Sequence, residues 1–340
     1  MSLPLTVCMP VYNSASYLSQ AIESVLSQSY SDFELLIVDD SSNDGSRQIS
    51  EAYANKDKRI KLILNSKNRG MVPNWNYCIE SSKGRYIKFL FGDDYFLAND
   101  TLARLKSVLD KSPSVTLVSS SRLVVDDKGN KIGEWQGFRE LDCQDSAKVA
   151  QACLELFYLK EGRLKFGCLK NLVGEPSAVM FRKEHALRGF NPEFRQFVDL
   201  EMWFQLFRQG DFAYIAEPLV AFRKHSGQQT NINTREMVYL WEYLELIKQN
   251  VRFAYPFIFP PLDRYLLMFE CYRTHNLNRR DGFFTDEVTR NSIARVISPA
   301  VYRLQLPLFL ALLPFYKLAA KFFAKSLTSY RDILPDLPLA

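Results

Sequence analysis

The feature that most constrains the fold is a regular alternation over the first hundred residues. Short apolar runs alternate with stretches whose apolar residues recur about every 3.6 positions, which is the helical period. The apolar runs predict buried strands at 5–10, 34–38, 60–64 and 86–91. Strands that alternate with helices form βαβ units. The sequence therefore predicts an α/β fold with a mostly parallel sheet flanked by helices.

Two of these predicted strands end in paired carboxylates. Asp39 and Asp40 follow the second strand, and Asp93 and Asp94 follow the fourth after Gly92. Open parallel sheets bind ligands at the carboxyl ends of their strands. Adjacent carboxylates repel each other, and their hard oxygens suit Mg²⁺ or Mn²⁺, which phosphate oxygens can help to coordinate. The pairs predict a metal–diphosphate site, and the alternative is a solvated turn that caps the next helix.

The amino-terminal part carries four segments that belong together: Thr6–Asn13, Leu36–Ser46, Asn68–Gly70 and Gly92–Asp94. In this order and at these spacings they resemble glycosyltransferase family 2. The resemblance covers roughly residues 3 to 230. It implies a GT-A fold and an inverting transfer of sugar from a nucleotide-sugar donor to a saccharide acceptor.

The resemblance also implies roles for residues at the nucleotide. It assigns to that site Pro10, Tyr12, Asn13, Asp40, Arg69 and Asp93. Pro10 and Tyr12 would pack on the base, since an aromatic ring offers a stacking platform. Asp40 would accept a hydrogen bond from a base N–H, which uracil and thymine present, and Asp93 would lie near the ribose. UDP is the expected nucleotide, with dTDP and GDP as alternatives. Arg69 would contact a phosphate or the sugar, and the alternative is a solvated charge in a loop.

The resemblance further implies that Asp94 binds Mg²⁺ or Mn²⁺ and that His225 approaches the metal or the diphosphate. A lone histidine is also compatible with a structural role. The segment Gly174–Arg182 resembles the part of the family that lines the acceptor side.

The expected catalytic base is Asp199, because the family usually carries Glu-Asp here before a helix. This chain has Val198 in place of the first acid, so the acceptor contact or pKa tuning of that acid is in question. Helix capping is the alternative for Asp199. Glu201 lies two positions on and cannot share its helical face. The altered motif supports a second hypothesis, a non-catalytic assembly subunit that binds nucleotide sugar or polysaccharide. A third hypothesis is a sugar-nucleotide hydrolase or pyrophosphorylase.

The carboxyl-terminal part of the chain predicts a separate region. We expect a GT-A domain over 1–230 and a helical, basic and apolar extension over 231–340. The segment 273–325 holds nine Arg or Lys against three Asp or Glu, whereas the whole chain is only +5. The apolar stretch 304–316 is shorter than the ~20 residues that span a bilayer. Residues 301–325 therefore predict a basic amphipathic segment on an anionic membrane surface, with a packed helical subdomain as the alternative.

Other classes of function lack their motifs. No G-x-G-x-x-G or G-x-x-x-x-G-K-[ST] occurs, which argues against dehydrogenases and P-loop enzymes, and no nucleic-acid reader motif is present. The six cysteines are scattered, which is typical of free thiols in a reducing cytoplasm. We expect a cytoplasmic enzyme, peripheral on the inner face of the cell membrane, with a lipid-linked acceptor.

The middle of the chain predicts a hairpin within 123–135 and an amphipathic helix from about 142 to 160.

Overall fold

The computed structural model describes residues 4–155, 157–160, 163–166, 169–228, 233, 239–254, 286–297 and 332–335. The strands are β1 (Leu5–Val11), β2 (Glu34–Asp39), β3 (Ile60–Leu64), β4 (Tyr86–Phe89), β5 (Tyr95–Phe96), β6 (Val115–Val125), β7 (Lys131–Trp135), β8 (Leu141–Gln144), β9 (Phe157–Lys160), β10 (Arg163–Phe166), β11 (Val179–Arg182) and β12 (Asp211–Arg223). The α-helices are α1 (Ala15–Leu26), α2 (Ser46–Ala54), α3 (Met71–Ser81), α4 (Thr101–Lys111), α5 (Ser146–Leu154), α6 (Val198–Phe207), α8 (Tyr239–Ala254) and α10 (Asp286–Val296). Short 3₁₀ turns lie at Pro176–Ala178 and Lys183–His185.

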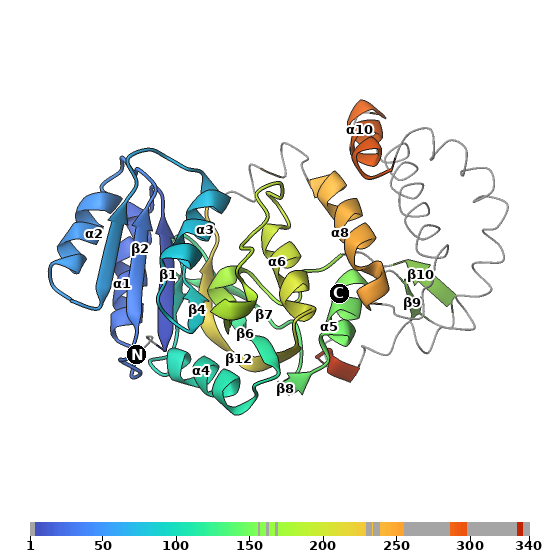
Figure 1. Cartoon of the computed structure of the whole chain (residues 1–340), viewed down its shortest axis with the longest axis horizontal. Helices are drawn as coiled ribbons and strands as arrows, with labels where there is room; N and C mark the ends of the chain where they lie inside the picture. Colours follow the sequence, from blue (N-terminus) through green and yellow to red (C-terminus); the bar gives the residue numbers. More distant parts are fainter. Residues whose placement is uncertain are drawn as a thin grey trace.

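A ten-stranded sheet forms the centre of the molecule, in the order β3-β2-β1-β4-β11-β6-β12-β5. Strands β7 and β8 pair with β6 and β12, and β9 and β10 form a separate hairpin. Pairing is parallel throughout β3-β2-β1-β4, the part predicted from the amino-terminal motifs. Figure 1 shows this part in blue, with helices on both faces of the sheet. The predicted α/β class is confirmed, with a central sheet flanked by helices and a parallel amino-terminal part.

The two faces of the sheet carry separate hydrophobic clusters. Along β1, Val7 and Met9 belong to one cluster with α1 and α4, whereas Cys8 belongs to the other with α3 and α6. This is the two-residue alternation of a strand, seen here with both faces buried. Because both faces are covered, the carboxyl edge of the sheet is the place where a ligand can reach these strands.

The second half of the sheet is mixed. Strand β11 runs antiparallel between β4 and β6, and β12 runs parallel to β6. The long β12 ends at Arg223, opposite Val125 of β6. This register returns the chain to the edge where β4 ends, so that Arg223 contacts Asp94 and His225 contacts Asp93. The predicted hairpin is confirmed as the antiparallel pair β6–β7.

The predicted helix from about 142 to 160 is wrong in its extent. Only Ser146–Leu154 is helical, and the side chain of Asp145 accepts a hydrogen bond from the N–H of Ala147 at its start. Before it, β8 pairs with the edge of β12, and after it β9 pairs with β10. Backbone pairing with a neighbouring strand therefore takes precedence over helix propensity at both ends of the segment.

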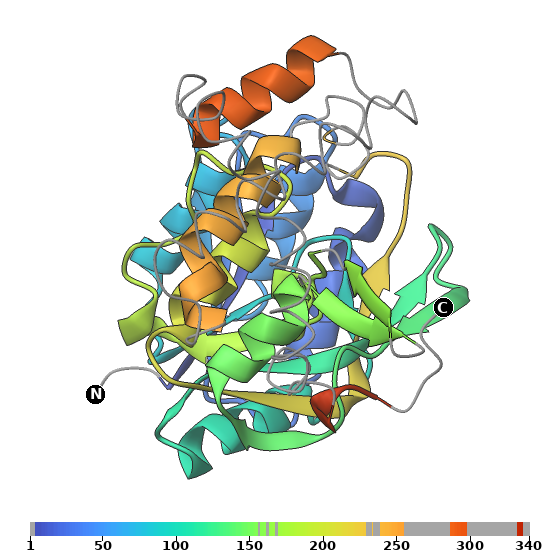
Figure 2. The same cartoon turned by 90° about the vertical axis from the view of Figure 1, so that its right-hand side faces the viewer.

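The described parts of the carboxyl-terminal region pack on the rest of the molecule. Helix α8 contacts α5 and α10, and both views show α8 beside α5 (Figures 1 and 2). Its buried Leu244, Ile247 and Val251 belong to the same cluster as Trp203 of α6. None of the described helices is both long and apolar enough to cross a bilayer. The predicted membrane-surface segment 301–325 lies outside the described residues, and the boundary near 230 stays a prediction.

Candidate active site

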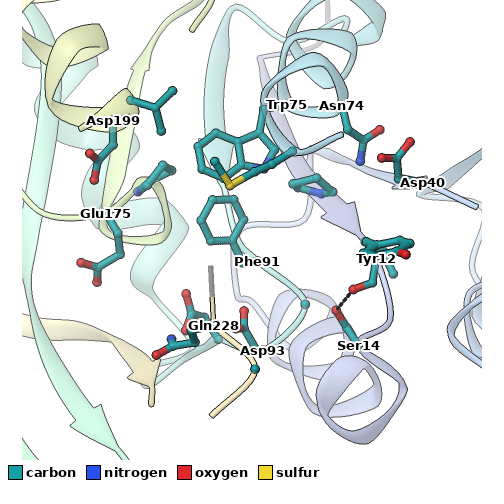
Figure 3. A pocket seen from close by; sticks show the side chains of 18 of the residues that line it. Tyr12, Ser14, Asp40, Asn74, Trp75, Phe91, Asp93, Glu175, Asp199 and Gln228 are labelled. Atoms are coloured by element: carbon teal, nitrogen blue, oxygen red, sulfur yellow. Dashed lines mark hydrogen bonds between the residues drawn. The ribbon is translucent and has the colours of Figure 1, made fainter. Parts of the chain in front are cut away.

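A cavity of about 620 Å³ opens at the carboxyl ends of β1, β2 and β4. Tyr12 and Asp40 lie on one wall, and Glu175 and Asp199 lie on the opposite wall (Figure 3). The predicted site residues that line it are Pro10, Tyr12, Asn13, Asp40, Asp93, Asp94, Asp199 and His225. The fold thus gathers residues that are far apart in the sequence around one space.

The loop after β1 presents Tyr12 to this cavity. The Tyr12 side chain is 53% exposed although β1 is buried. The loop is held by its neighbour: Asn13 Oδ1 accepts a hydrogen bond from the N–H of Asn43 at 3.0 Å, and the Asn13 N–H donates to Ser42 Oγ at 3.0 Å. Asn13 adopts a left-handed φ of 51°, which asparagine tolerates better than most residues. Within the described contacts the Asn13 side chain supports the loop, while the Tyr12 ring is available as a platform.

Asp40 is buried at the end of β2 and organises the loop before α3. Its Oδ1 accepts from Asn65 Nδ2 at 2.8 Å and from the N–H of Arg69 at 2.9 Å, and its Oδ2 accepts from the N–H of Gly70 at 3.0 Å. A carboxylate has about four lone-pair positions. One position on Oδ2 therefore remains for a ligand, so Asp40 can support the loop and also accept a base N–H.

Arg69 takes a different place from the other predicted residues. Its guanidinium lies over the ring of Tyr77, 3.9 Å from the ring centre, in a cation–π contact. Its side chain is exposed and does not line the cavity. The structure therefore shows a backbone role for Arg69 beside Asp40, and a contact to phosphate stays a prediction.

Asp93, Asp94 and His225 form the acidic edge of the cavity. Asp93 Oδ2 lies 3.0 Å from His225 Nε2. Asp94 is buried, and its Oδ1 accepts from the N–H of Arg223 at 3.0 Å. Its Oδ2 is also buried and accepts no hydrogen bond from the described residues. Burial, and then the charge of Asp93, raise the pKa of the Asp94 carboxyl.

These residues partly fit a divalent cation. Among the described residues no group of three His, Cys, Asp or Glu side chains is arranged around a common metal position. The unpartnered Asp94 Oδ2 nevertheless offers one hard ligand atom, with Asp93 and His225 beside it. Mg²⁺ and Mn²⁺ are commonly held by one or two carboxylates together with substrate phosphates and water. The site fits such a cation if a diphosphate supplies the other ligands.

Two basic residues near the acidic edge have structural roles. Arg223 donates to the carbonyl oxygens of Asp93 and Asp126 and, at 2.7 Å, to Gln20 Oε1. Lys88 is fully buried within β4, and its ammonium donates to the carbonyl of Ser177. Burial lowers the pKa of Lys88 to about 7, and the nearby Asp94 opposes this shift. Lys88 was not predicted as part of the site, although a charge inside the apolar run 86–91 is a signal visible in the sequence.

Asp199 lies in the first turn of α6 on the far wall. Its Oδ2 accepts from Asn171 Nδ2 at 2.7 Å, and its Oδ1 accepts from the N–H of Leu200 at 2.7 Å. Loss of solvation raises the pKa of Asp199 to about 7.

The two neighbours of Asp199 in the motif do not share this role. Glu201 is buried in a two-point ion pair with Arg188 and does not line the cavity. Val198 packs in the core at 3% exposure, which is compatible with an apolar side chain where the family usually has an acid.

Glu175 is a second carboxylate of this wall that the sequence did not single out. Its Oε2 pairs with Arg122 Nε at 2.8 Å, and its Oε1 is buried without a hydrogen-bond partner among the described residues. Its charge also favours the protonated form of Asp199, and so contributes to the raised pKa. The available signal was its place within Gly174–Arg182, the segment expected on the acceptor side.

The loop before α6 is fixed from the carboxyl-terminal region. The carboxylate of Glu242, fully buried on α8, accepts from the N–H groups of Arg195, Gln196 and Phe197 at 2.8, 2.9 and 2.8 Å. All three of these residues line the cavity. A helix outside the predicted catalytic domain therefore shapes the segment that leads into Asp199.

The model of the family described as Glycosyl transferase family 2 matches residues 6–185, more than half of the chain. The chain belongs to glycosyl transferase family 2. This confirms the resemblance seen in the motifs and identifies the chain as a glycosyltransferase. The match ends before Asp199 and His225, so their roles rest on the geometry of the cavity.

Related proteins agree with this family. The putative glycosyltransferase EpsE of Bacillus subtilis is 27% identical over 297 residues, which cover 83% of this chain and 98% of EpsE. The putative teichuronic acid biosynthesis glycosyltransferase TuaG of the same organism is 28% identical over 210 residues, covering 62% of this chain and 74% of TuaG. The crystal structure of S. aureus TarS 1-349 in complex with UDP superposes with a TM-score of 0.60 at 17% identity, covering 96% of this chain and 91% of that one. At this identity the likeness concerns the fold, and it agrees with the predicted GT-A architecture.

Proposed function

We propose that this chain is an inverting, metal-dependent glycosyltransferase that moves a sugar from a UDP-sugar to a saccharide acceptor in surface polysaccharide synthesis. The observation that carries the proposal is that Tyr12 and Asp40 on one wall and Asp199 on the other line the same cavity. Tyr12 and Asp40 suit a uracil base, and Asp199 suits a proton acceptor. The names of TuaG and TarS–UDP support the polysaccharide setting and the nucleotide.

The proposed reaction is one displacement. The acceptor hydroxyl oxygen attacks the anomeric carbon and forms the new C–O bond while its proton passes to the Asp199 carboxylate. The bond from the anomeric carbon to the diphosphate oxygen breaks, and its electron pair leaves with the nucleoside diphosphate. Attack from the face opposite the nucleotide inverts the anomeric centre. A pKa of about 7 places Asp199 near the optimum for a general base at neutral pH.

The residues of the acidic edge have a separate task. Asp94, with Asp93 and His225 beside it, would hold Mg²⁺ or Mn²⁺ against the diphosphate. Such a cation supplies Lewis-acid stabilisation of the charge on the departing group. Asp40 would fix the base, and Pro10 and Tyr12 would pack against it. The acceptor is proposed to be lipid-linked, and residues 301–325 to rest on the anionic inner face of the cell membrane.

A non-catalytic subunit that binds nucleotide sugar or polysaccharide is the second candidate, and Val198 in the altered motif is the observation that favours it. A panel of UDP-, dTDP- and GDP-sugars with Mn²⁺ and a bacterial lipid extract separates the two. We expect sugar to be retained on the extract with an inverted anomeric centre, most strongly from a UDP-sugar. Nucleotide-sugar binding without any transfer would support the binding subunit. Release of free sugar or sugar phosphate would instead show a hydrolase or pyrophosphorylase.

A further inference from the structure

Two aromatic side chains lie between the walls of the cavity. Trp75 comes from α3, and Phe91 follows β4. Their rings are stacked, with centroids 4.8 Å apart and planes at 28°. Both are half-buried and line the cavity, and Figure 3 shows them between Asp199 and Glu175 on one side and Tyr12 and Asp40 on the other. They therefore border the region between the nucleotide and the proposed base.

This aromatic pair is braced from behind. Phe190 and Trp75 form a T-shaped pair with centroids 5.2 Å apart and planes at 73°. The backbone of Phe190 is itself fixed, because its N–H donates to Asn76 Oδ1 at 2.7 Å and its carbonyl accepts from Asn76 Nδ2 at 2.8 Å. Phe89 supports Phe91 from the strand, 6.3 Å away between centroids. A pair held in this way is preorganised and loses little conformational freedom when a ligand binds.

Trp75 differs from a tryptophan that only fills the core. Trp203 is fully buried, and its indole N–H donates to the carbonyl of Gly174 at 2.8 Å. Trp75 keeps part of its surface in the cavity, and its ring contacts are not accompanied by a hydrogen bond to any described residue. An indole that lines the cavity and has no N–H partner among the described residues suits a ligand with both apolar and polar groups.

We propose that Trp75 and Phe91 form a platform for a pyranose ring, an inference that rests on the proposed function. The face of an aromatic ring carries partial negative charge, and the C–H groups on one face of a pyranose are apolar and carry slight positive charge. Hydroxyl groups project from the edge of such a ring. Glu175 Oε1, buried and without a partner among the described residues, and Asp199 lie on the wall where these hydroxyls would point. The platform is separate from Tyr12, which already suits the nucleobase.

The test uses the full chain with three substitutions: Trp75→Leu, Trp75→Phe and Phe91→Leu. Leucine is apolar but smaller and lacks the aromatic face, whereas phenylalanine keeps an aromatic face, so Trp75→Phe is the matched control. Calorimetry with Mn²⁺ measures the Kd of UDP and of the UDP-sugar that the wild type uses. Steady-state kinetics measure the KM of the acceptor, and thermal melting checks the fold.

We expect Trp75→Leu and Phe91→Leu to weaken binding of a sugar by about tenfold, since one aromatic contact contributes on that scale. UDP affinity should not change, and Trp75→Phe should retain most of the sugar affinity. A higher Kd of the UDP-sugar alone would place the donor sugar on the platform, and a higher acceptor KM alone would place the acceptor there. Equal losses for UDP and UDP-sugar, or no loss for either sugar, would refute the platform. Failure of the proposed function is distinct, because the wild type would then transfer no sugar.

Discussion

Asp199 is the residue on which the proposed chemistry depends most. Replacing it with asparagine keeps size and hydrogen bonding but removes the proton acceptor, and loss of a general base typically costs ~10²–10⁴ in rate. We therefore expect Asp199→Asn to reduce kcat of sugar transfer at least about a hundredfold while the Kd of UDP stays unchanged. Glu201→Gln is the comparison variant for a neighbouring acid outside the cavity. Wild-type turnover of Asp199→Asn would move the base elsewhere.

The pKa of Asp199, raised to about 7, predicts a pH dependence of transfer. A base acts when ionised, so kcat should rise with pH through about 7 and level above it. The Asn171 amide donates to Asp199 Oδ2 and so favours the ionised form. Asn171→Ala should shift the rising limb of the pH–rate profile to higher pH. A profile that is flat from pH 5 to 9, or a shift to lower pH in Asn171→Ala, would contradict this role.

Asp94 is predicted to bind the metal ion. Its Oδ2 is buried and unpartnered among the described residues, which suits a ligand atom for a cation. Calorimetry of the wild type should show tighter UDP binding with Mn²⁺ than with a chelator. Asp94→Ala should lose this difference and most of its transfer activity, and thermal melting in the absence of metal checks that the variant still folds without the hydrogen bond from the Arg223 N–H. Equal UDP affinity of the wild type with metal and with chelator would exclude the metal assignment.

At the scale of elements, α8 is predicted to act on the site through Glu242. Three backbone N–H groups of the loop 195–197 depend on its carboxylate, and each donor left unsatisfied in a buried place costs about 1–3 kcal/mol. Glu242→Ala should therefore lower kcat and increase amide hydrogen exchange at 195–197. Glu245→Ala, on the same helix and paired with Lys248 at its surface, is the matched control. Unchanged exchange in that loop would show that other contacts hold it.

Elements with a strong local pattern were predictable from the sequence. The buried parallel strands and the Asp pairs at their ends predicted which edge of the sheet holds the site. This was possible because periodicity and turn chemistry are local properties. The helix predicted from about 142 to 160 failed because β8 and β9 pair with strands that the local pattern does not reveal. Glu175, Glu242 and Trp75 escaped for a related reason. The role proposed for each depends on neighbours distant in sequence, such as Phe190, 115 positions after Trp75.

At the scale of the whole molecule, we expect the protein to associate with an anionic membrane surface. Residues 301–325 lie outside the described part of the chain, and their basic and apolar composition carries the expectation. Each Lys near an anionic surface contributes roughly 1 kcal/mol. Replacing Lys317, Lys321 and Lys325 with glutamate should release most of the protein from anionic vesicles in a flotation assay. The wild type should float at low salt, and its recovery in the soluble fraction would favour a packed subdomain.

The position of Glu242 also has a consequence for exchanging parts between related enzymes. The family match ends at residue 185, yet the loop that leads into Asp199 is held from residue 242. A chimaera joined near residue 230 would combine one protein's loop 195–197 with another protein's α8. Such a hybrid should transfer sugar only if the incoming helix brings a carboxylate to the same three N–H groups. The carboxyl-terminal region and the loop 195–197 therefore have to be inherited together.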